Sequence, residues 1–119
     1  MNNKRVPGDR SISRSFIARY AAEAALRTEG VASLEAGSLS IIKEQFGGRN
    51  EGKGVLVNYA DEHNSSVNIS IYPIVYFGFV VPEVASNIQE NVKKDIEQYT
   101  DLEVLSVDIH VRGICELGD

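Results

Sequence analysis

The sequence contains one cysteine, Cys115, one methionine, three prolines and no tryptophan among its 119 residues. A single cysteine excludes an intrachain disulfide and a metal site built from cysteines, which fits a reducing compartment. Long apolar runs are also missing, because the longest, Ile74–Val81, is interrupted by Gly78 and is far shorter than the roughly 20 residues of a membrane-spanning helix. The sequence therefore predicts a protein that does not insert directly into a membrane.

The amino-terminal residues lack the apolar segment that follows the basic residues of a secretory signal, so we expect a cytoplasmic protein. Twelve basic and 17 acidic residues give a net charge of −5, which argues against a nucleic acid partner. Hydrophobic residues make up 43% of the chain, as in soluble globular domains. We assign residues 11–119 to a single domain and expect residues 1–10, with Pro7 and Gly8, to form a flexible arm.

Apolar residues recur at helical spacing from Ser13 to about Arg27. Ser13 or Ser15 can cap the start of this helix, and Gly30 can end it. Leu39, Ile42 and Phe46 predict a short helix further along.

A longer helix follows Pro82, which is tolerated in a first helical turn because its missing N–H would be unpaired there anyway. A single apolar stripe runs along this helix. It consists of Val81, Val84, Ala85, Ile88, Val92, Ile96 and Tyr99.

Alternation of apolar and polar residues predicts three strands. The segment 54–60 and the run that contains Val67, Ile69 and Ile71 flank a polar turn and predict a β-hairpin. The last strand follows the long helix. Its expected apolar face consists of Leu105, Val107, Ile109 and Val111.

This order of elements predicts a two-layer α+β fold. Strand, helix and strand in one sheet usually form a right-handed parallel crossover, so the last strand should run parallel to the second hairpin strand. We expect a small mixed sheet of about three to four strands. The fourth would be a short strand near Ser11 or Val31, and the helices would pack on one face.

Three groups of residues resemble catalytic or binding motifs without completing them. The segment 47–53 has the spacing of a phosphate loop, but we expect it to connect a helix to a strand, and Gly54 replaces the hydroxyl residue that binds magnesium. The segment 61–63 and the residues around His110 are interpreted as a solvated turn and a solvated strand face. Because no nucleophile, base or metal cluster emerges, we predict a protein that is not an enzyme, with no cofactor and no metal.

One strip of residues suggests a contact surface. If Val67, Ile69, Ile71, Val75 and Phe77 face the helices, then Tyr72, Ile74 and Tyr76 lie on the opposite face, which no predicted helix covers. An open strip of aromatic and aliphatic side chains is typical of a protein interface. Tyr72, Ile74 and Tyr76 are therefore the candidate residues for a protein–protein contact, unless the amino-terminal segment or the short helix covers them.

Over residues 12–114 the chain resembles the alkaline shock protein family, the envelope stress response proteins of Gram-positive bacteria. The segments that carry the resemblance follow one another in the same order along the chain. They are Ala24–Val31, Lys53–Val55, Phe77–Ala85, Ile88–Val92, Tyr99–Val104 and Val107–Ile114.

The resemblance implies a non-enzymatic cytoplasmic protein that self-associates, gathers at the inner face of the membrane through a membrane-anchored partner, and supports cell-envelope homeostasis under stress. Two other hypotheses remain open: a regulatory module that binds RNA or a lipid-metabolism enzyme, and weak attraction of the basic amino-terminal segment to anionic lipid.

Overall fold

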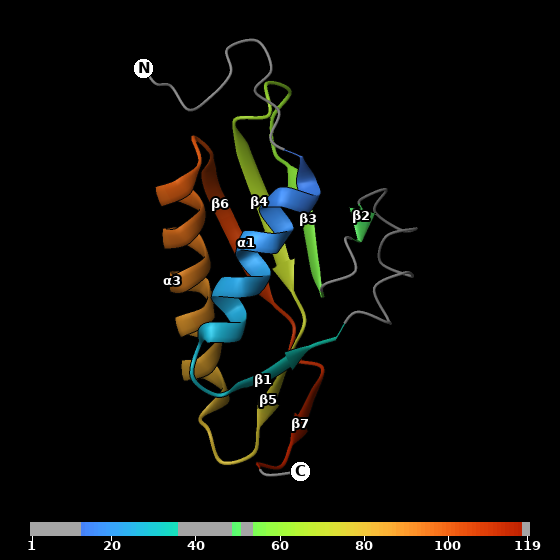
Figure 1. Cartoon of the computed structure of the whole chain (residues 1–119), viewed down its shortest axis with the longest axis vertical. Coiled ribbons are helices and arrows are strands. Elements are labelled where there is room, and N and C mark those ends of the chain that lie inside the picture. The colour runs from blue at the N-terminus through green and yellow to red at the C-terminus, as the bar shows by residue number, and fades with distance from the viewer. Residues whose placement is uncertain (1–12, 36–48, 51–53, 118–119) are drawn as a thin grey trace.

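The computed structural model describes residues 13–35, 49–50 and 54–117 (Figure 1). The short helix predicted around Leu39 and the flexible arm predicted over residues 1–10 lie outside these ranges. The described elements, in chain order, are α1 (Arg14–Arg27), β1 (Val31–Leu34), β2 (Arg49–Asn50), β3 (Val55–Tyr59), β4 (Ser66–Ile71), β5 (Pro73–Tyr76), α3 (Val81–Tyr99), β6 (Glu103–Ile109) and β7 (Gly113–Cys115).

Helix α1 begins and ends where local chemistry favours it. The Phe16 N–H donates to the Ser13 side-chain oxygen at 3.2 Å, so Ser13 is the N-cap of α1. The chain then turns into β1 through Gly30, whose φ of +97° is accessible to glycine without steric cost. Both helix boundaries agree with the sequence prediction.

The predicted hairpin and the parallel crossover are both confirmed. Strands β3 and β4 pair antiparallel, β4 and β6 pair parallel, and α3 connects them. Strand β2 adds to the other side of β3, which gives one mixed sheet in the order β2-β3-β4-β6. The fold is the expected α+β arrangement, with α1 and α3 on one face of this sheet (Figure 1).

The structure corrects the prediction of one sheet, because β1, β5 and β7 form a second mixed sheet in the order β1-β5-β7. The ladder changes partner at Tyr72, whose N–H donates to the Gly54 carbonyl while its own carbonyl accepts from the Glu35 N–H. Pro73, which follows, has no N–H to donate. The strand that begins as β4 against β3 therefore continues as β5 against β1.

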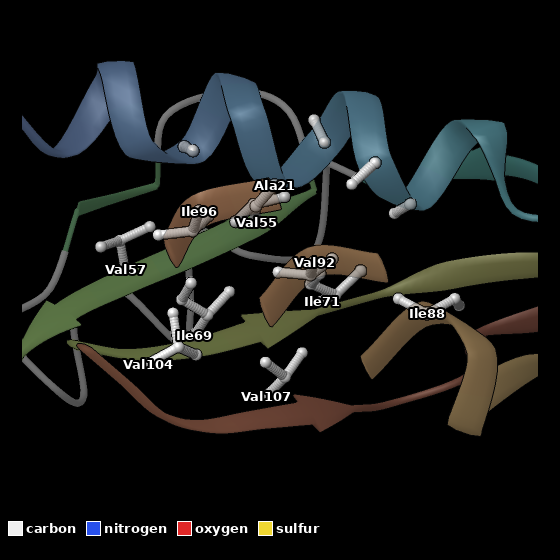
Figure 2. Close-up of a cluster of buried hydrophobic side chains, with 14 of the residues drawn as sticks. Ala21, Val55, Val57, Ile69, Ile71, Ile88, Val92, Ile96, Val104 and Val107 are labelled. Carbon is white, nitrogen blue, oxygen red and sulfur yellow. The ribbon is translucent and has the colours of Figure 1, made fainter. Parts of the chain in front are cut away.

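The core lies between the helices and the sheets (Figure 2). Helix α1 contributes small side chains such as Ala21, which bring it close to the sheet, and α3 contributes a row of larger ones. The fully buried members include Ile17, Val55, Val57, Val67, Ile69, Ile71, Val75, Ile88, Val92 and Ile96. Four of the five residues expected to face the helices, all except Phe77, are among them.

Strand β6 departs from the predicted alternation. Val104 and Val107 are buried, whereas Leu105, expected on the inner face, is 54% exposed. The register with β4 shifts at this point, since Val67 pairs with Val104 but Asn68 pairs with Ser106. The irregularity turns Leu105 outward.

Polar side chains of α3 hydrogen-bond to the outer edge of β6. Gln89 Nε2 donates to the Val107 carbonyl at 2.8 Å, and Lys93 Nζ donates to the Val104 carbonyl at 3.1 Å. Glu97 Oε2 accepts from the Val104 N–H at 2.8 Å and from Lys93 Nζ at 3.0 Å. The Glu97 carboxylate, on the exposed side of α3, therefore protects this edge of the sheet.

We expect stability to depend on the ionisation of Glu97. The Val104 N–H, and secondly Lys93, lower the pKa of Glu97 below its ordinary value of 4.5. A lowered pKa means that this stabilisation is present above the unfolded-state pKa and disappears as pH falls through the folded-state pKa. In urea titrations at pH values from about 7 to about 3, the wild type should unfold at a higher urea midpoint than Glu97→Gln. The difference between the two midpoints should become smaller as the pH falls. Glu90→Gln, an exposed change on the same helix, should show no such difference, and a constant difference for Glu97→Gln would contradict the assignment.

Candidate functional site

Tyr72, the first residue of the predicted contact strip, is not part of an open surface. It lies between β4 and β5, is 5% exposed, and stacks on the His110 ring with centroids 4.9 Å apart. Burial raises the pKa of the Tyr72 phenol, and the hydrogen bond with Ser70 and the charge of Arg112 oppose that shift. His110 itself is exposed, as expected for a solvated strand face, while its ring stacks on Tyr72.

Ile74 and Tyr76, the other two residues of the strip, are half-buried on β5. In the ladder with β7, Ile74 pairs with Gly113 and Tyr76 pairs with Cys115. Ile74 leans over Gly113, because a Cβ at residue 113 would lie 3.3 Å from Ile74 Cδ1. Part of the strip is therefore accessible, and it lies beside the last strand of the second sheet.

The chain segments 77–80 and 114–117 lie at the end of the molecule where the second sheet ends (Figure 1). We call Phe77, Val80, Ile114 and Leu117 the apolar end; their exposed fractions are 70%, 56%, 50% and 65%. The Phe77 N–H donates to the Cys115 carbonyl at 2.7 Å, which holds the two chain segments together. Clusters of this kind on small domains are typical of protein contacts.

Phe77 overturns an expectation, because we predicted that it would face the helices. The chain turns immediately after β5, and Gly78 adopts a φ of +100°, so the alternation of the strand does not continue to residue 77. The sequence did contain an indication of these exposed residues. The apolar run continues past the end of the strand to Val80, where the sheet can no longer bury its side chains.

A second exposed group lies on the helices. The Phe16 and Tyr20 rings meet edge to face at 5.1 Å, and Tyr20 stacks on Tyr99 at 5.5 Å. A shallow hollow of about 200 Å³ beside them is lined by Phe16, Arg19, Tyr20 and Glu23. Phe16 is 45% exposed, and Tyr99, which the sequence places on the apolar stripe of the long helix, is 57% exposed.

The remaining candidate motifs have local structural roles or lie outside the described residues. Asp61 accepts hydrogen bonds from the side chains and N–H groups of Ser65 and Ser66, which lower the pKa of its carboxyl group and close the β3–β4 turn. Within residues 13–35 and 54–117, no three His, Cys, Asp or Glu side chains are grouped to hold a metal ion. Of the segment that resembles a phosphate loop, only β2 belongs to the described residues.

Comparisons with known proteins place these features in context. Residues 2–115 match the family of alkaline shock protein 23, which is described by a cell envelope-related function and not by a reaction. Protein YqhY of Bacillus subtilis is 35% identical over 107 residues, which cover 90% of this chain and 77% of YqhY. Protein YloU of the same organism is 32% identical over 113 residues, covering 90% of this chain and 88% of YloU.

Solved structures show the same fold at low sequence identity. One variant of the MamM CTD superposes with a TM-score of 0.58 at 13% identity, covering 85% of this chain and 99% of that one. A zinc form of the MamM CTD gives 0.55 at 16% identity, covering 87% of each chain. In the described part of this chain, no helix is both long enough and apolar enough to span a membrane.

Proposed function

Because the chain belongs to the family of alkaline shock protein 23, which has a cell envelope-related function, we propose that it is a scaffold and not an enzyme. In this proposal it associates with further copies of itself in the cytoplasm and docks at the inner face of the membrane through a membrane-anchored protein. The complex would support cell-envelope homeostasis under stress.

The observation that carries the proposal is the apolar end. Its four exposed side chains stand within a few residues of one another along two chain segments joined by a backbone hydrogen bond. Exposed apolar area of this kind lowers solubility unless another protein surface covers it. A scaffold requires exposed contact surfaces of this kind. Among the described residues, no group of side chains forms an equally clear candidate for a substrate-binding site.

We assign the membrane-anchored partner to the strip that contains Ile74 and Tyr76. Both side chains are partly accessible, and Tyr76 combines a large apolar ring with a hydroxyl group that can hydrogen-bond across an interface. Tyr72 supports this strip from within the fold, since its ring is buried against His110. Of the three predicted contact residues, we thus assign contact with the partner to Ile74 and Tyr76, and a supporting role to Tyr72.

The experiment is co-purification from the source cells, in which a tagged copy is expressed beside the untagged protein and membrane and soluble fractions are separated after gentle lysis. We expect untagged copies and one transmembrane protein in the membrane fraction. Tyr76→Ser should reduce recovery of the transmembrane protein while retaining untagged copies, and Tyr99→Ser, which changes a tyrosine on the helical face, should reduce neither.

Different results would contradict the proposal. Recovery of a soluble monomer alone would remove both self-association and docking. Recovery with RNA or with lipid-metabolism enzymes, and without a transmembrane protein, would favour the regulatory alternative. Circular dichroism of each variant establishes that a lost interaction does not reflect a lost fold.

A further inference from the structure

The carboxy-terminal edge strands of the two sheets differ in how they are covered. The outer edge of β6 receives hydrogen bonds from Gln89, Lys93 and Glu97 of α3. Strand β7 is also an edge strand, because it pairs only with β5. Within the described residues, no side chain hydrogen-bonds to the backbone of β7. An uncovered edge of this kind can pair with a strand from another chain.

The sequence around β7 is complementary to itself in one antiparallel register. With Ile114 opposite Ile114 of a second copy, Gly113 lies opposite Cys115, and Arg112 lies opposite Glu116. Beyond them, Val111 lies opposite Leu117. Apolar residues thus meet apolar residues and opposite charges meet, as stable cross-strand pairs require.

Other registers lose this complementarity. A shift of one residue in either direction places Arg112 opposite Cys115 or opposite Leu117, and leaves Glu116 without an opposite charge. Arg112 and Glu116 are both exposed, and neither makes an ion pair with the described part of its own chain. As far as the described residues are concerned, both charges are available to pair with a second copy.

We propose that β7 pairs with β7 of a second copy, antiparallel and with Ile114 on the two-fold axis. This inference rests on the self-association in the proposed function and identifies the surface that performs it. The two three-stranded sheets become one sheet of six strands. The symmetric contact closes on itself as a dimer and covers Ile114 and Leu117 of the apolar end.

The same geometry has a consequence for docking. A two-fold axis between antiparallel strands is perpendicular to the sheet, so corresponding faces of both copies point to the same side. Ile74 and Tyr76 of each copy, which lie on β5 next to β7, would then form one continuous surface across the dimer. A partner that binds this strip would meet two copies of it together.

A disulfide experiment tests the register directly. The variant Ile114→Cys with Cys115→Ser places one thiol per chain on the proposed axis, and opposed residues in antiparallel strands have Cα atoms about 4.5–5.5 Å apart, within disulfide range. We expect a covalent dimer under mild oxidation. Leu105→Cys with Cys115→Ser is the matched control, since Leu105 is similarly exposed, on the edge strand that α3 covers. Cross-linking of both variants, or of neither, would overturn the proposed pairing.

Charge reversal provides an independent test. Arg112→Glu alone and Glu116→Arg alone each create two repulsive pairs in the dimer and should weaken dimerisation about tenfold or more in sedimentation equilibrium. The double variant Arg112→Glu with Glu116→Arg should recover most of the affinity, because the charges are exchanged. Glu103→Arg on β6 should leave dimerisation unchanged. Weakening in the single variants without recovery in the double variant would contradict the register.

The outcomes separate this inference from the proposed function. A wild-type protein that remains monomeric at every concentration would refute self-association itself. A wild-type protein that associates, but whose Ile114→Cys variant does not cross-link and whose charge variants associate normally, would refute only the pairing through β7.

Discussion

Replacing Gly54 with alanine is expected to lower the free energy of unfolding by about 2–5 kcal/mol, combining positive-φ strain with overpacking. Gly54 has a φ of +75°, and a Cβ at this position would lie 2.5 Å from Leu34 Cβ and 3.1 Å from the Glu35 backbone nitrogen. The Gly54 carbonyl also accepts the Tyr72 N–H at the point where the ladder changes sheets. Alanine would therefore force apart the segments that join the two sheets.

The measurement is urea or thermal denaturation followed by circular dichroism. Gly78→Ala is the matched control, because Gly78 also has a positive φ but a Cβ there would meet nothing within 4 Å. The free energy of unfolding of this control should fall only by the cost of placing alanine in the left-handed backbone conformation, about 1 kcal/mol. Equal losses in the two variants would mean that the contact with Leu34 contributes nothing.

Replacing Ile69 with alanine is expected to destabilise the fold by about 2–5 kcal/mol, the usual cost of truncating a buried isoleucine. Ile69 is fully buried on β4, a central strand, and it pairs with Val57 on one side and Val107 on the other (Figure 2). Neighbouring side chains on a strand that is fixed on both sides have little freedom to fill the cavity.

Leu105→Ala provides the comparison for this second variant. Leu105 lies on the same sheet but more than half of its side chain is exposed, so its truncation should cost no more than about 0.5 kcal/mol. Denaturant midpoints at neutral pH, measured with both variants in parallel, compare the two losses of stability. A large loss in Leu105→Ala would imply that this side chain is covered, as it would be if β6 and not β7 formed the interface.

Local patterns predicted most of the main sheet and both described helices. Helix α3 has an uninterrupted apolar stripe, and α1 has a serine cap and a glycine at its end, so their signals lie within a few residues of chain. The β3–β4 hairpin follows from alternation on both sides of a polar turn. The parallel placement of β6 follows from the handedness of crossover connections, which applies to any sequence with this order of elements.

Other features of the same segments could not be predicted because they depend on partners distant in sequence. The alternation of β6 suggested that Leu105 faced inward, but the register with β4 shifts at this point. Phe16 and Tyr99 have apolar side chains at core-like spacing, and only the structure shows that both are about half exposed.

The candidate contact residues also include some that local patterns indicate and some that only the structure shows. Alternation alone identified Ile74 and Tyr76 as residues of the face away from the helices. It also included Tyr72, because nothing local indicates that the His110 ring, 38 positions later, will cover it. Strand β7 was not predicted at all, since three residues containing a glycine carry no recognisable period.

The sequence by itself determined the α+β class, the order of the principal elements and most of the residues that fill the core, because each of these depends on periodicity, capping or handedness. The family was recognised from the resemblance of whole segments. Only the tertiary structure decided that the strand through Tyr72 and Pro73 serves two sheets, and that β7 is an edge strand of the second sheet. Both depend on which backbone groups find partners in distant segments, and a one-dimensional pattern does not contain that information.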